Sequence, residues 1–281
     1  MKPPRTFTTA IDINATPDEV WRALTDAGEL VRWFPLQARV TPGVGGRMFW
    51  GWDSHWAWES DIDVWEPGKR LRLLENRPAF DASGKPMSGP RQPLAMEFTL
   101  EPREGGTTIR IVHSGFGEGA SWDDELDSVS AGWQFELRGL RHYLERHKGR
   151  DRHYASIQRV TSLGMSEVWT RLLSREAFEI VDGEIALDAH LAIASATGER
   201  ITGSVAWHNP ERDLFVRVAD LSDGLFRLST WRGGGATGLQ IWMVTYDPRH
   251  APRVDRFGQQ VEPLVNRLFP QKQLPASAAS V

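Results

Sequence analysis

The sequence predicts an α+β fold built from two tandem domains, each an antiparallel sheet packed against a long helix at the domain's C-terminal end. One long amphipathic helix is indicated at residues 121–148. Strand-like runs separated by Gly and Pro precede it over residues 36–112. The same order of patterns returns later in the chain, which indicates a repeated domain. We expect one domain at 1–149, a second, divergent one at 153–270 and a flexible tail at 271–281.

The amino-acid composition excludes several classes of function for this chain. The 281 residues are 40% hydrophobic and 25% charged, as in folded globular proteins. The chain has no cysteine, which excludes disulfides, thiolate catalysis and thiolate metal sites. The net charge of −4 gives no overall basic field for nucleic acid. No apolar run approaches the ~20 residues that span a bilayer. We expect a cytoplasmic protein that binds neither nucleic acid nor membrane.

The first elements are a strand and two short helices. Residues 6–13 are rich in β-formers and predict a strand. Thr16 can cap a helix, and Pro17 suits its first position. A second short helix follows Asp26, and Pro35 stops it.

Residues 50–64 alternate with period two and predict one strand region with its indoles on a single face. The even positions carry large apolar side chains: Trp50, Trp52, Trp56, Trp58, Ile62 and Val64. Further strands are indicated at 71–74, 94–100 and 107–113. By parity, Phe98 and His113 point toward the interior.

The long helix has start, stop and face signals. Ser121 is its expected cap, and Gly149 suits the position after its end. Its apolar stripe consists of Leu126, Val129, Trp133, Leu137, Leu140 and Leu144. Such a stripe needs a broad apolar surface, which the preceding sheet supplies.

The second half repeats this order. A strand at 154–160 precedes a helix whose Glu167-Val168-Trp169 echoes Glu19-Val20-Trp21. Strands follow at 185–193, 200–207, 214–218, 225–231 and 239–246. A last helix is expected at 254–269, with Pro263 inside it.

Several stretches resemble one superfamily. Residues 15–26, which read Ala-Thr-Pro-Asp-Glu-Val-Trp-Arg-Ala-Leu-Thr-Asp, together with residues 30–34 look like the opening of the START-like helix-grip (SRPBCC) superfamily. Residues 113–117, Gly132-Trp133 and residues 140–145 are similar to its branch named after the Hsp90 ATPase activator homologue. The resemblance covers residues 6–148, and it extends to 154–270 through the order of elements.

This resemblance implies two helix-grip domains, each a curved antiparallel sheet packed around a long C-terminal helix, often with a cavity between them. Relatives bind lipids, sterols, polyketides or plant hormones, and some are cyclases or hydrolases. The eukaryotic activators carry an additional chaperone-docking domain that nothing in this sequence matches, so the family name alone does not imply chaperone activation.

Motifs for other chemistry are missing from the sequence. It has no Gly-x-Ser-x-Gly elbow and no His-Glu-x-x-His zinc helix. The glycines at 233–238 lack the Lys and Ser/Thr of a phosphate loop and predict a hairpin turn. His55, Asp53 and Glu59 alternate along one strand, too widely spaced for a metal site. We expect no metal and no cofactor.

The leading hypothesis is binding of a small hydrophobic molecule between the first sheet and its long helix. The expected ligand-binding residues are Trp50, Trp52, Trp58, Phe98, His113, Trp133 and Leu137, with His113 as polar anchor. Two alternatives stay open for the tryptophans, which either line a pocket or fill a solid core. His113 is likewise either a hydrogen-bonded core histidine or a functional group.

Two other functions remain as alternatives. The chain could be a cyclase- or hydrolase-like enzyme with His113 as acid and base; otherwise no catalytic residue is expected. It could instead be a chaperone-linked interaction module that binds a protein partner through its second domain. In the leading hypothesis the second domain is structural or regulatory.

Overall fold

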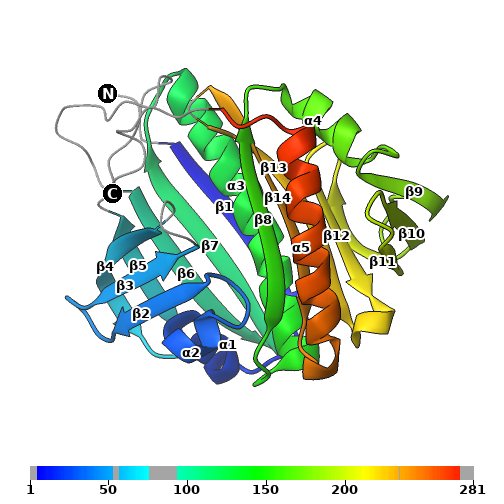
Figure 1. Ribbon diagram of the computed structural model, residues 1–281. Helices are drawn as coiled ribbons and strands as arrows, with labels where there is room; N and C mark the ends of the chain where they lie inside the picture. Colours follow the sequence, from blue (N-terminus) through cyan, green and yellow to red (C-terminus); the bar gives the residue numbers. More distant parts are fainter. Residues whose placement is uncertain (1–4, 53–56, 76–93, 234, 273–281) are drawn as a thin grey trace. The chain divides into compact units, whose positions relative to one another are not determined.

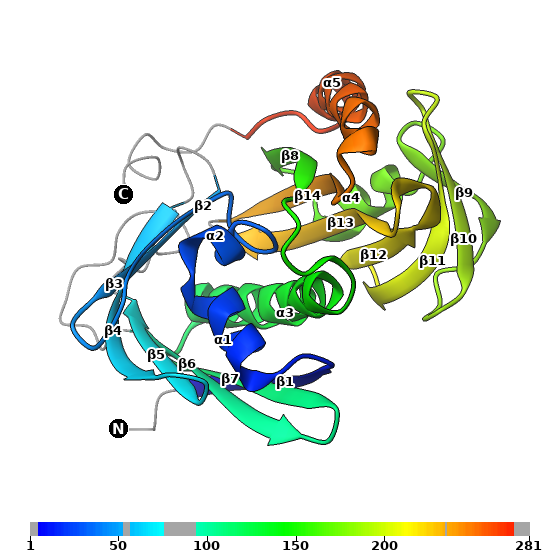
Figure 2. The same cartoon turned by 90° about the horizontal axis from the view of Figure 1, so that it is seen from below.

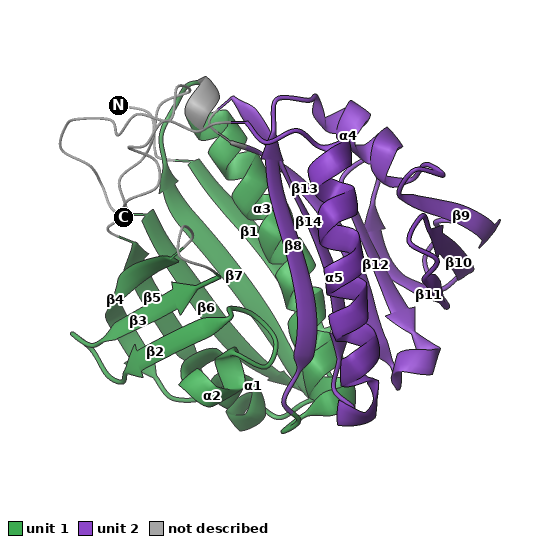
Figure 3. Ribbon diagram, viewed as in Figure 1, with its two compact units in different colours: residues 1–150, 274–281 green, residues 151–273 purple. Residues whose placement is uncertain are grey.

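The computed structural model describes residues 5–52, 57–75, 94–233 and 235–272. They divide into two compact units, unit 1 within residues 1–150 and unit 2 within residues 151–273 (Figure 3). Each unit contains a seven-stranded antiparallel sheet and ends in a long helix. The predicted α+β fold with two tandem helix-grip domains is therefore confirmed.

Unit 1 has its sheet in the order β1-β7-β6-β5-β4-β3-β2. Its elements are β1 (Arg5–Ile13), α1 (Pro17–Thr25), α2 (Ala27–Leu30), β2 (Gln37–Thr41), β3 (Arg47–Gly51), β4 (Ala57–Glu66), β5 (Arg70–Glu75), β6 (Leu94–Arg103), β7 (Gly106–Phe116) and α3 (Ala120–His142). The sheet curves around α3, with α1 and α2 beside one end of that helix (Figures 1 and 2).

Unit 2 repeats the topology with the order β8-β14-β13-β12-β11-β10-β9. Its elements are β8 (His153–Thr161), α4 (Met165–Leu172), β9 (Phe178–Gly183), β10 (His190–Ser195), β11 (Arg200–Asn209), β12 (Asp213–Val218), a 3-10 turn (Ala219–Leu221), β13 (Gly224–Gly233), β14 (Ala236–Thr245), a second 3-10 turn (Pro248–His250) and α5 (Ala251–Leu268). Sequence reasoning placed a single strand at 185–193 and missed β9. Positive φ angles at Gly183 and Asp188 break the extended chain there.

Helix α1 begins as its sequence predicts. The Thr16 hydroxyl accepts a hydrogen bond from the Glu19 amide, and the Glu19 carboxylate accepts one from the Thr16 amide, which completes a capping box. Val20, Trp21 and Leu24 form the buried side of the helix. Helix α1 therefore packs on β6 and β7 through this side.

Helix α3 differs from its prediction at the start. It begins at Ala120 with Gly119 as N-cap, so the expectation that Ser121 caps it was wrong. The φ of 105° at Gly119 is open mainly to glycine, which makes this residue the turning point into the helix. At the other end the helix widens into a π-helical turn, Tyr143–His147, before Gly149 with φ 78°.

Glu29 connects α2 to this π-helical turn. Its Oε2 atom accepts a hydrogen bond from the Tyr143 hydroxyl at 2.5 Å, and Arg32 lies 2.9 Å from Oε1. The Tyr143 oxygen in turn accepts from the Gly149 amide. Burial, followed by the hydrogen bond to Glu29, raises the pKa of Tyr143 to about 12. Three segments of unit 1 thus meet in one buried polar network.

The tryptophan-rich stretch also differs from its prediction. We expected one strand region over residues 50–64, but β3 and β4 are two strands of a hairpin. The even-numbered indoles still share a face, because Trp50 pairs directly with Trp58 across the hairpin. Residues 53–56, with His55 and Trp56, lie outside the described residues.

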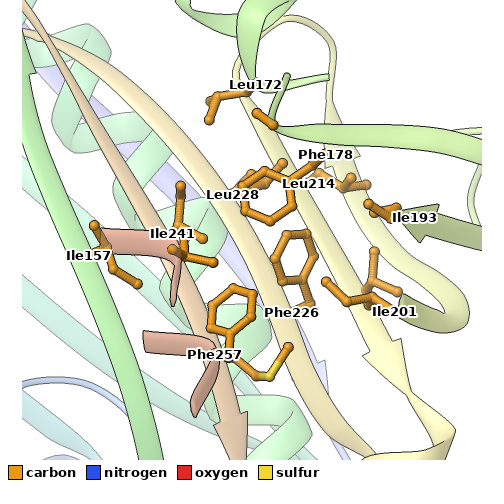
Figure 4. Packing of buried hydrophobic residues seen from close by; sticks show 14 of the residues in the cluster. Ile157, Leu172, Phe178, Ile193, Ile201, Leu214, Phe226, Leu228, Ile241 and Phe257 are labelled. Atoms are coloured by element: carbon orange, nitrogen blue, oxygen red, sulfur yellow. The ribbon is translucent and has the colours of Figure 1, made fainter. Parts of the chain in front are cut away.

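Unit 2 has a continuous apolar core between its sheet and helices α4 and α5 (Figure 4). Phe178, Phe226 and Phe257 pack with ring centroids 5.3–6.3 Å apart. Helix α5 runs through Pro263, which lies on its exposed side. Among the described residues, this cluster holds apolar side chains only.

Asp213, at the start of β12, is an acid buried in unit 2 but outside that apolar cluster. It is 2% exposed and accepts a hydrogen bond from the Ser229 hydroxyl at 2.7 Å. Burial is the main cause that raises the pKa of Asp213 to about 6, against the opposing hydrogen bond from Ser229.

Candidate functional site

The inner face of the unit 1 sheet, which faces α3, carries a cluster of large aromatic rings. Trp50 lies opposite Trp58 with ring centroids 6.1 Å apart, and Trp52 stacks on Trp58 at 4.9 Å. Trp50 is 2% exposed, whereas Trp52 and Trp58 are half-buried. The hairpin register explains why Trp50 and Trp58 lie close together, because directly opposite residues of an antiparallel pair project to the same face of the sheet.

Helix α3 completes the cluster from the other side. The Trp133 ring lies 6.4 Å from Trp50 and 5.4 Å from Phe98, both with edge-to-face geometry. Leu137, one turn further along the same stripe, is fully buried. The structure therefore brings together the aromatic residues that the sequence selected.

Phe34 belongs to this cluster and was missed. Its ring lies 5.0–5.2 Å from the rings of Trp50, Trp52 and Trp133, at the end of the turn after α2. No periodicity marks a residue in such a turn. The available signal was the apolar pair Trp33-Phe34 directly before a helix-stopping proline. We call Phe34, Trp50, Trp52, Trp58, Phe98 and Trp133 the aromatic cluster.

Three polar side chains, Ser60, Glu75 and His113, lie on the same inner face and form what we call the polar row. They are 1%, 4% and 1% exposed. Ser60 pairs with Glu75 across β4 and β5. Glu75 Oε1 is 3.7 Å from His113 Nε2, and the His113 ring lies 4.9 Å from the ring of Phe116. His113 thus has the inward position that its sequence parity predicted.

Sequence reasoning missed Ser60 and Glu75. The signal for Glu75 was its parity, since it follows Leu71 and Leu73 at intervals of two along one strand. Ser60 falls between the even-numbered Trp58 and Ile62 in the same way. A polar residue at an inward position is more informative than an apolar one, because burial without partners is costly.

Two buried polar atoms of this face have no hydrogen-bond partner among the described residues. They are the Ser60 hydroxyl oxygen and the indole nitrogen of Trp50. An unsatisfied buried donor costs about 1–3 kcal/mol. A polar group placed within hydrogen-bonding distance of these atoms would recover that cost.

Unit 2 offers an internal comparison because its sheet has the same strand order. The shared Glu-Val-Trp helices align α1 with α4, and the same alignment places Phe7 of β1 with Ala155 of β8. The strand partner of Phe7 is His113, and that of Ala155 is Met243. Met243 is thus the unit 2 counterpart of His113.

The strand registers extend this alignment across both sheets. The counterparts of Ser60, Glu75, His113, Trp50, Trp58 and Phe98 are Gly203, Val218, Met243, Ile193, Ile201 and Leu228. All of them lack a polar side chain, and all but Gly203 are part of the unit 2 apolar cluster. At these six positions unit 1 has polar and aromatic side chains, whereas unit 2 has glycine, methionine or branched aliphatic side chains; the same unit 2 face also carries Phe226 and Thr230.

The described ranges contain neither a metal-binding group of side chains nor a membrane-spanning helix. They hold no group of three or more His, Asp or Glu side chains placed to bind a metal ion. None of their helices is long and apolar enough to cross a membrane. His55 and Asp53, which the sequence analysis considered as metal ligands together with Glu59, lie outside the described residues.

The fold and this inner face define unit 1 as a helix-grip domain of the START-like (SRPBCC) superfamily. Residues 14–145 match the family model described as "Activator of Hsp90 ATPase homolog 1-like protein". No match was found among curated proteins.

The solved structures that resemble this chain match either about half of it or nearly all of it. A protein from Mesorhizobium loti is 25% identical, with a TM-score of 0.44 over 51% of this chain and 99% of that one. The Aha1 dimer from Colwellia psychrerythraea is 21% identical, with a TM-score of 0.42 over 52% of this chain and 99% of that one. The di-domain ARO/CYC protein BexL of the BE-7585A biosynthetic pathway is 13% identical, with a TM-score of 0.42 over 96% of this chain and 100% of that one.

Proposed function

We propose that unit 1 binds a small hydrophobic molecule between the inner face of its sheet and α3. The aromatic cluster forms the walls of this site, and His113 is its polar anchor. The observation that carries the proposal is the contrast at three aligned positions of the inner faces, since Ser60, Glu75 and His113 of unit 1 stand where unit 2 has Gly203, Val218 and Met243.

Energetics support a binding role for these polar atoms. In unit 2 a sheet of the same strand order packs on its helices through a large cluster of buried apolar side chains. Replacement of buried polar groups by packed apolar groups is often neutral or stabilising. Ser60, Glu75 and His113 are therefore not needed to hold a sheet and helix together, and a ligand gives them a use.

The aromatic cluster suits a ligand wall. Ligand sites are lined mainly by apolar and aromatic side chains with a few placed polar groups. Trp133 contacts Phe34, Trp50 and Phe98 from the helix side, so it links both walls. Unit 2 has no counterpart of this combination at the aligned positions, so we propose one ligand per chain and a structural or regulatory role for unit 2.

Native mass spectrometry of the freshly purified chain tests this proposal. A discrete extra mass that disappears on denaturation is the expected result, and its size would restrict the ligand's identity. The chain is then saturated with the recovered compound to measure stoichiometry. Two equivalent binding events per chain would contradict the assignment to unit 1 alone.

One observation favours an enzyme as the second candidate. The Glu75 carboxyl lies 3.7 Å from His113 Nε2, a placement in which a carboxylate can orient an imidazole for acid–base catalysis. If this function holds, His113→Ala abolishes turnover of the recovered compound while the compound still binds. Conversion is followed by mass. An unchanged compound after incubation with the wild-type chain would speak for binding alone.

A further inference from the structure

We propose that Trp50 and Ser60 donate hydrogen bonds to a carbonyl oxygen of the unit 1 ligand, so that this site takes a carbonyl compound. This inference rests on the proposed function and adds the chemical class of the ligand. It follows from the burial of the two donors, from the strand register that places them on one face, and from their counterparts in unit 2.

Both donors are buried without a partner. Trp50 on β3 is 2% exposed and Ser60 on β4 is 1% exposed. Within the part of the chain that the structure describes, neither the Trp50 indole nitrogen nor the Ser60 hydroxyl oxygen takes part in a hydrogen bond. Buried polar groups of folded proteins are nearly always hydrogen-bonded, because burial without a partner is costly. Two such atoms on one face therefore indicate a place for a further polar group.

The register of the β3–β4 hairpin puts the two donors within reach of one ligand. Trp50 pairs with Trp58, and Ser60 pairs with Met48. Ser60 is thus two residues from the direct partner of Trp50, on the same face of the hairpin. Diagonal neighbours of this kind are close enough for an aromatic side chain to reach across. A single group of the ligand can therefore lie between them.

The rings around Trp50 do not take the place of an acceptor. Its ring meets those of Phe34, Trp58 and Trp133 at interplanar angles of 70–79°, with centroids 5.2–6.4 Å apart. A contact between an N–H group and a ring face is second-order beside a hydrogen bond to oxygen. The aromatic contacts account for the position of the Trp50 ring, but they leave its buried donor without an oxygen acceptor.

The chemistry of the two donors selects the group that they bind. An indole N–H only donates, whereas a serine hydroxyl either donates or accepts. An acceptor is therefore the one kind of group that both side chains can serve. A carbonyl oxygen meets this requirement, because it has two lone pairs and no hydrogen of its own. A ligand group that only donates would leave the Trp50 N–H unsatisfied.

Unit 2 lacks this pair of donors. Trp50 and Ser60 align with Ile193 and Gly203, neither of which has a polar side chain. The buried Thr230 of the same unit 2 face donates its hydroxyl hydrogen to the carbonyl oxygen of Arg212 at 3.2 Å. The Thr230 hydroxyl thus has its partner within the protein, in contrast to the Ser60 hydroxyl.

Two probes of nearly the same shape test this inference on the full chain. They are 2-acetonaphthone and 2-isopropenylnaphthalene, which differ only in the exchange of the carbonyl oxygen for a methylene group. In calorimetric titrations at neutral pH we expect the ketone to bind about tenfold more tightly, as one additional hydrogen bond allows. The carbonyl stretching frequency of the bound ketone should be lower than in cyclohexane, because a hydrogen bond weakens the C=O bond.

Variants of the two donors locate the effect. Trp50→Phe keeps a ring and removes the N–H, and Ser60→Ala removes the hydroxyl. Each variant should lower the affinity ratio of ketone to hydrocarbon severalfold and raise the carbonyl stretching frequency. The ratio is the decisive quantity, because a change in packing alone affects both probes alike.

Matched controls make the same substitutions away from the two donors. Trp65→Phe alters an indole of β4 that packs on Trp21 with ring centroids 5.1 Å apart, outside the aromatic cluster. Ser114→Ala removes a hydroxyl of β7 that donates to the Ala95 carbonyl at 3.4 Å. Both controls should keep the wild-type ratio of the two affinities.

The outcomes separate the inference from the function on which it rests. A ketone preference that falls in both donor variants and persists in both controls supports the inference. Equal binding of the two probes to the wild type, or an unchanged preference in either donor variant, overturns the inference while the hydrophobic site stands. Binding of neither probe would contradict both the inference and the proposed function.

Discussion

His113 on β7 and Glu75 on β5 face each other at 3.7 Å although strand β6 lies between their own strands. On the intervening strand, Leu94 pairs with Glu75 and Met96 pairs with His113. An acid and an imidazole buried together on an apolar face form a polar centre that strand pairing alone does not require. The role of this polar centre, in binding or in the structural core, decides the function of unit 1.

Replacement of the polar row by apolar side chains, with the unit 2 residues Val and Met at positions 75 and 113, should separate binding from stability. In the triple variant Ser60→Ala, Glu75→Val, His113→Met we expect ligand binding to be lost. The free energy of unfolding should stay equal or rise by about 1–4 kcal/mol, because buried polar groups are replaced by packed apolar ones. Denaturant unfolding and calorimetry measure the two effects. A strongly destabilised triple variant would instead assign the polar row to the structural core.

Trp133 should matter more for binding than a tryptophan of unit 2. Trp133→Ala removes the ring that contacts Phe34, Trp50 and Phe98, and we expect affinity to fall by about tenfold or more. Trp207→Ala on β11 is the control and should change affinity little. Titration of both folded variants with the ligand measures the two affinities. Equal losses of affinity would contradict the placement of the site in unit 1.

The bond between Tyr143 and Glu29 should contribute to the stability of unit 1. Tyr143→Phe leaves the buried Glu29 carboxylate without one donor, and we expect a loss of about 1–2 kcal/mol in unfolding free energy. Tyr154→Phe, on the partly exposed Tyr154, is the control and should cost little. An equal loss in both variants would show that the hydroxyl bond is not the cause.

Asp213 should make unit 2 less stable as the pH rises. Its folded pKa of about 6 lies above the ordinary value of 3.8, so the folded state binds the proton more tightly. The stabilisation is complete below about pH 4 and is lost as the pH rises through about 6, with a total of about 2–3 kcal/mol. Denaturant midpoints between pH 4 and 7 measure it. A flat profile, or one unchanged in Asp213→Asn, would contradict this assignment.

Much of the fold could be predicted because periodicity and end signals are local. The Thr16 cap, the short helix after Asp26 and the apolar stripe through Trp133 and Leu144 were all predicted from the sequence. Strand β9 was missed because its end depends on backbone conformations at Gly183 and Asp188 that no alternation pattern reveals.

The site was predictable only in part. Parity selected Trp50, Trp58, Phe98 and His113 for the inner face, and the structure brings the aromatic ones together with Trp133. The sequence alone could not show that Phe34 and Glu75 lie close to these residues. Their proximity depends on how a turn folds over the sheet and on which strands lie two apart.

The most direct test of the account is native mass spectrometry of freshly purified protein, run side by side on the wild-type chain and the triple variant. The account predicts one bound molecule per wild-type chain and none on the variant, with both proteins folded. Equal occupancy of the two proteins, or no binding to the wild type, would contradict the claim that the polar row of unit 1 marks a ligand site.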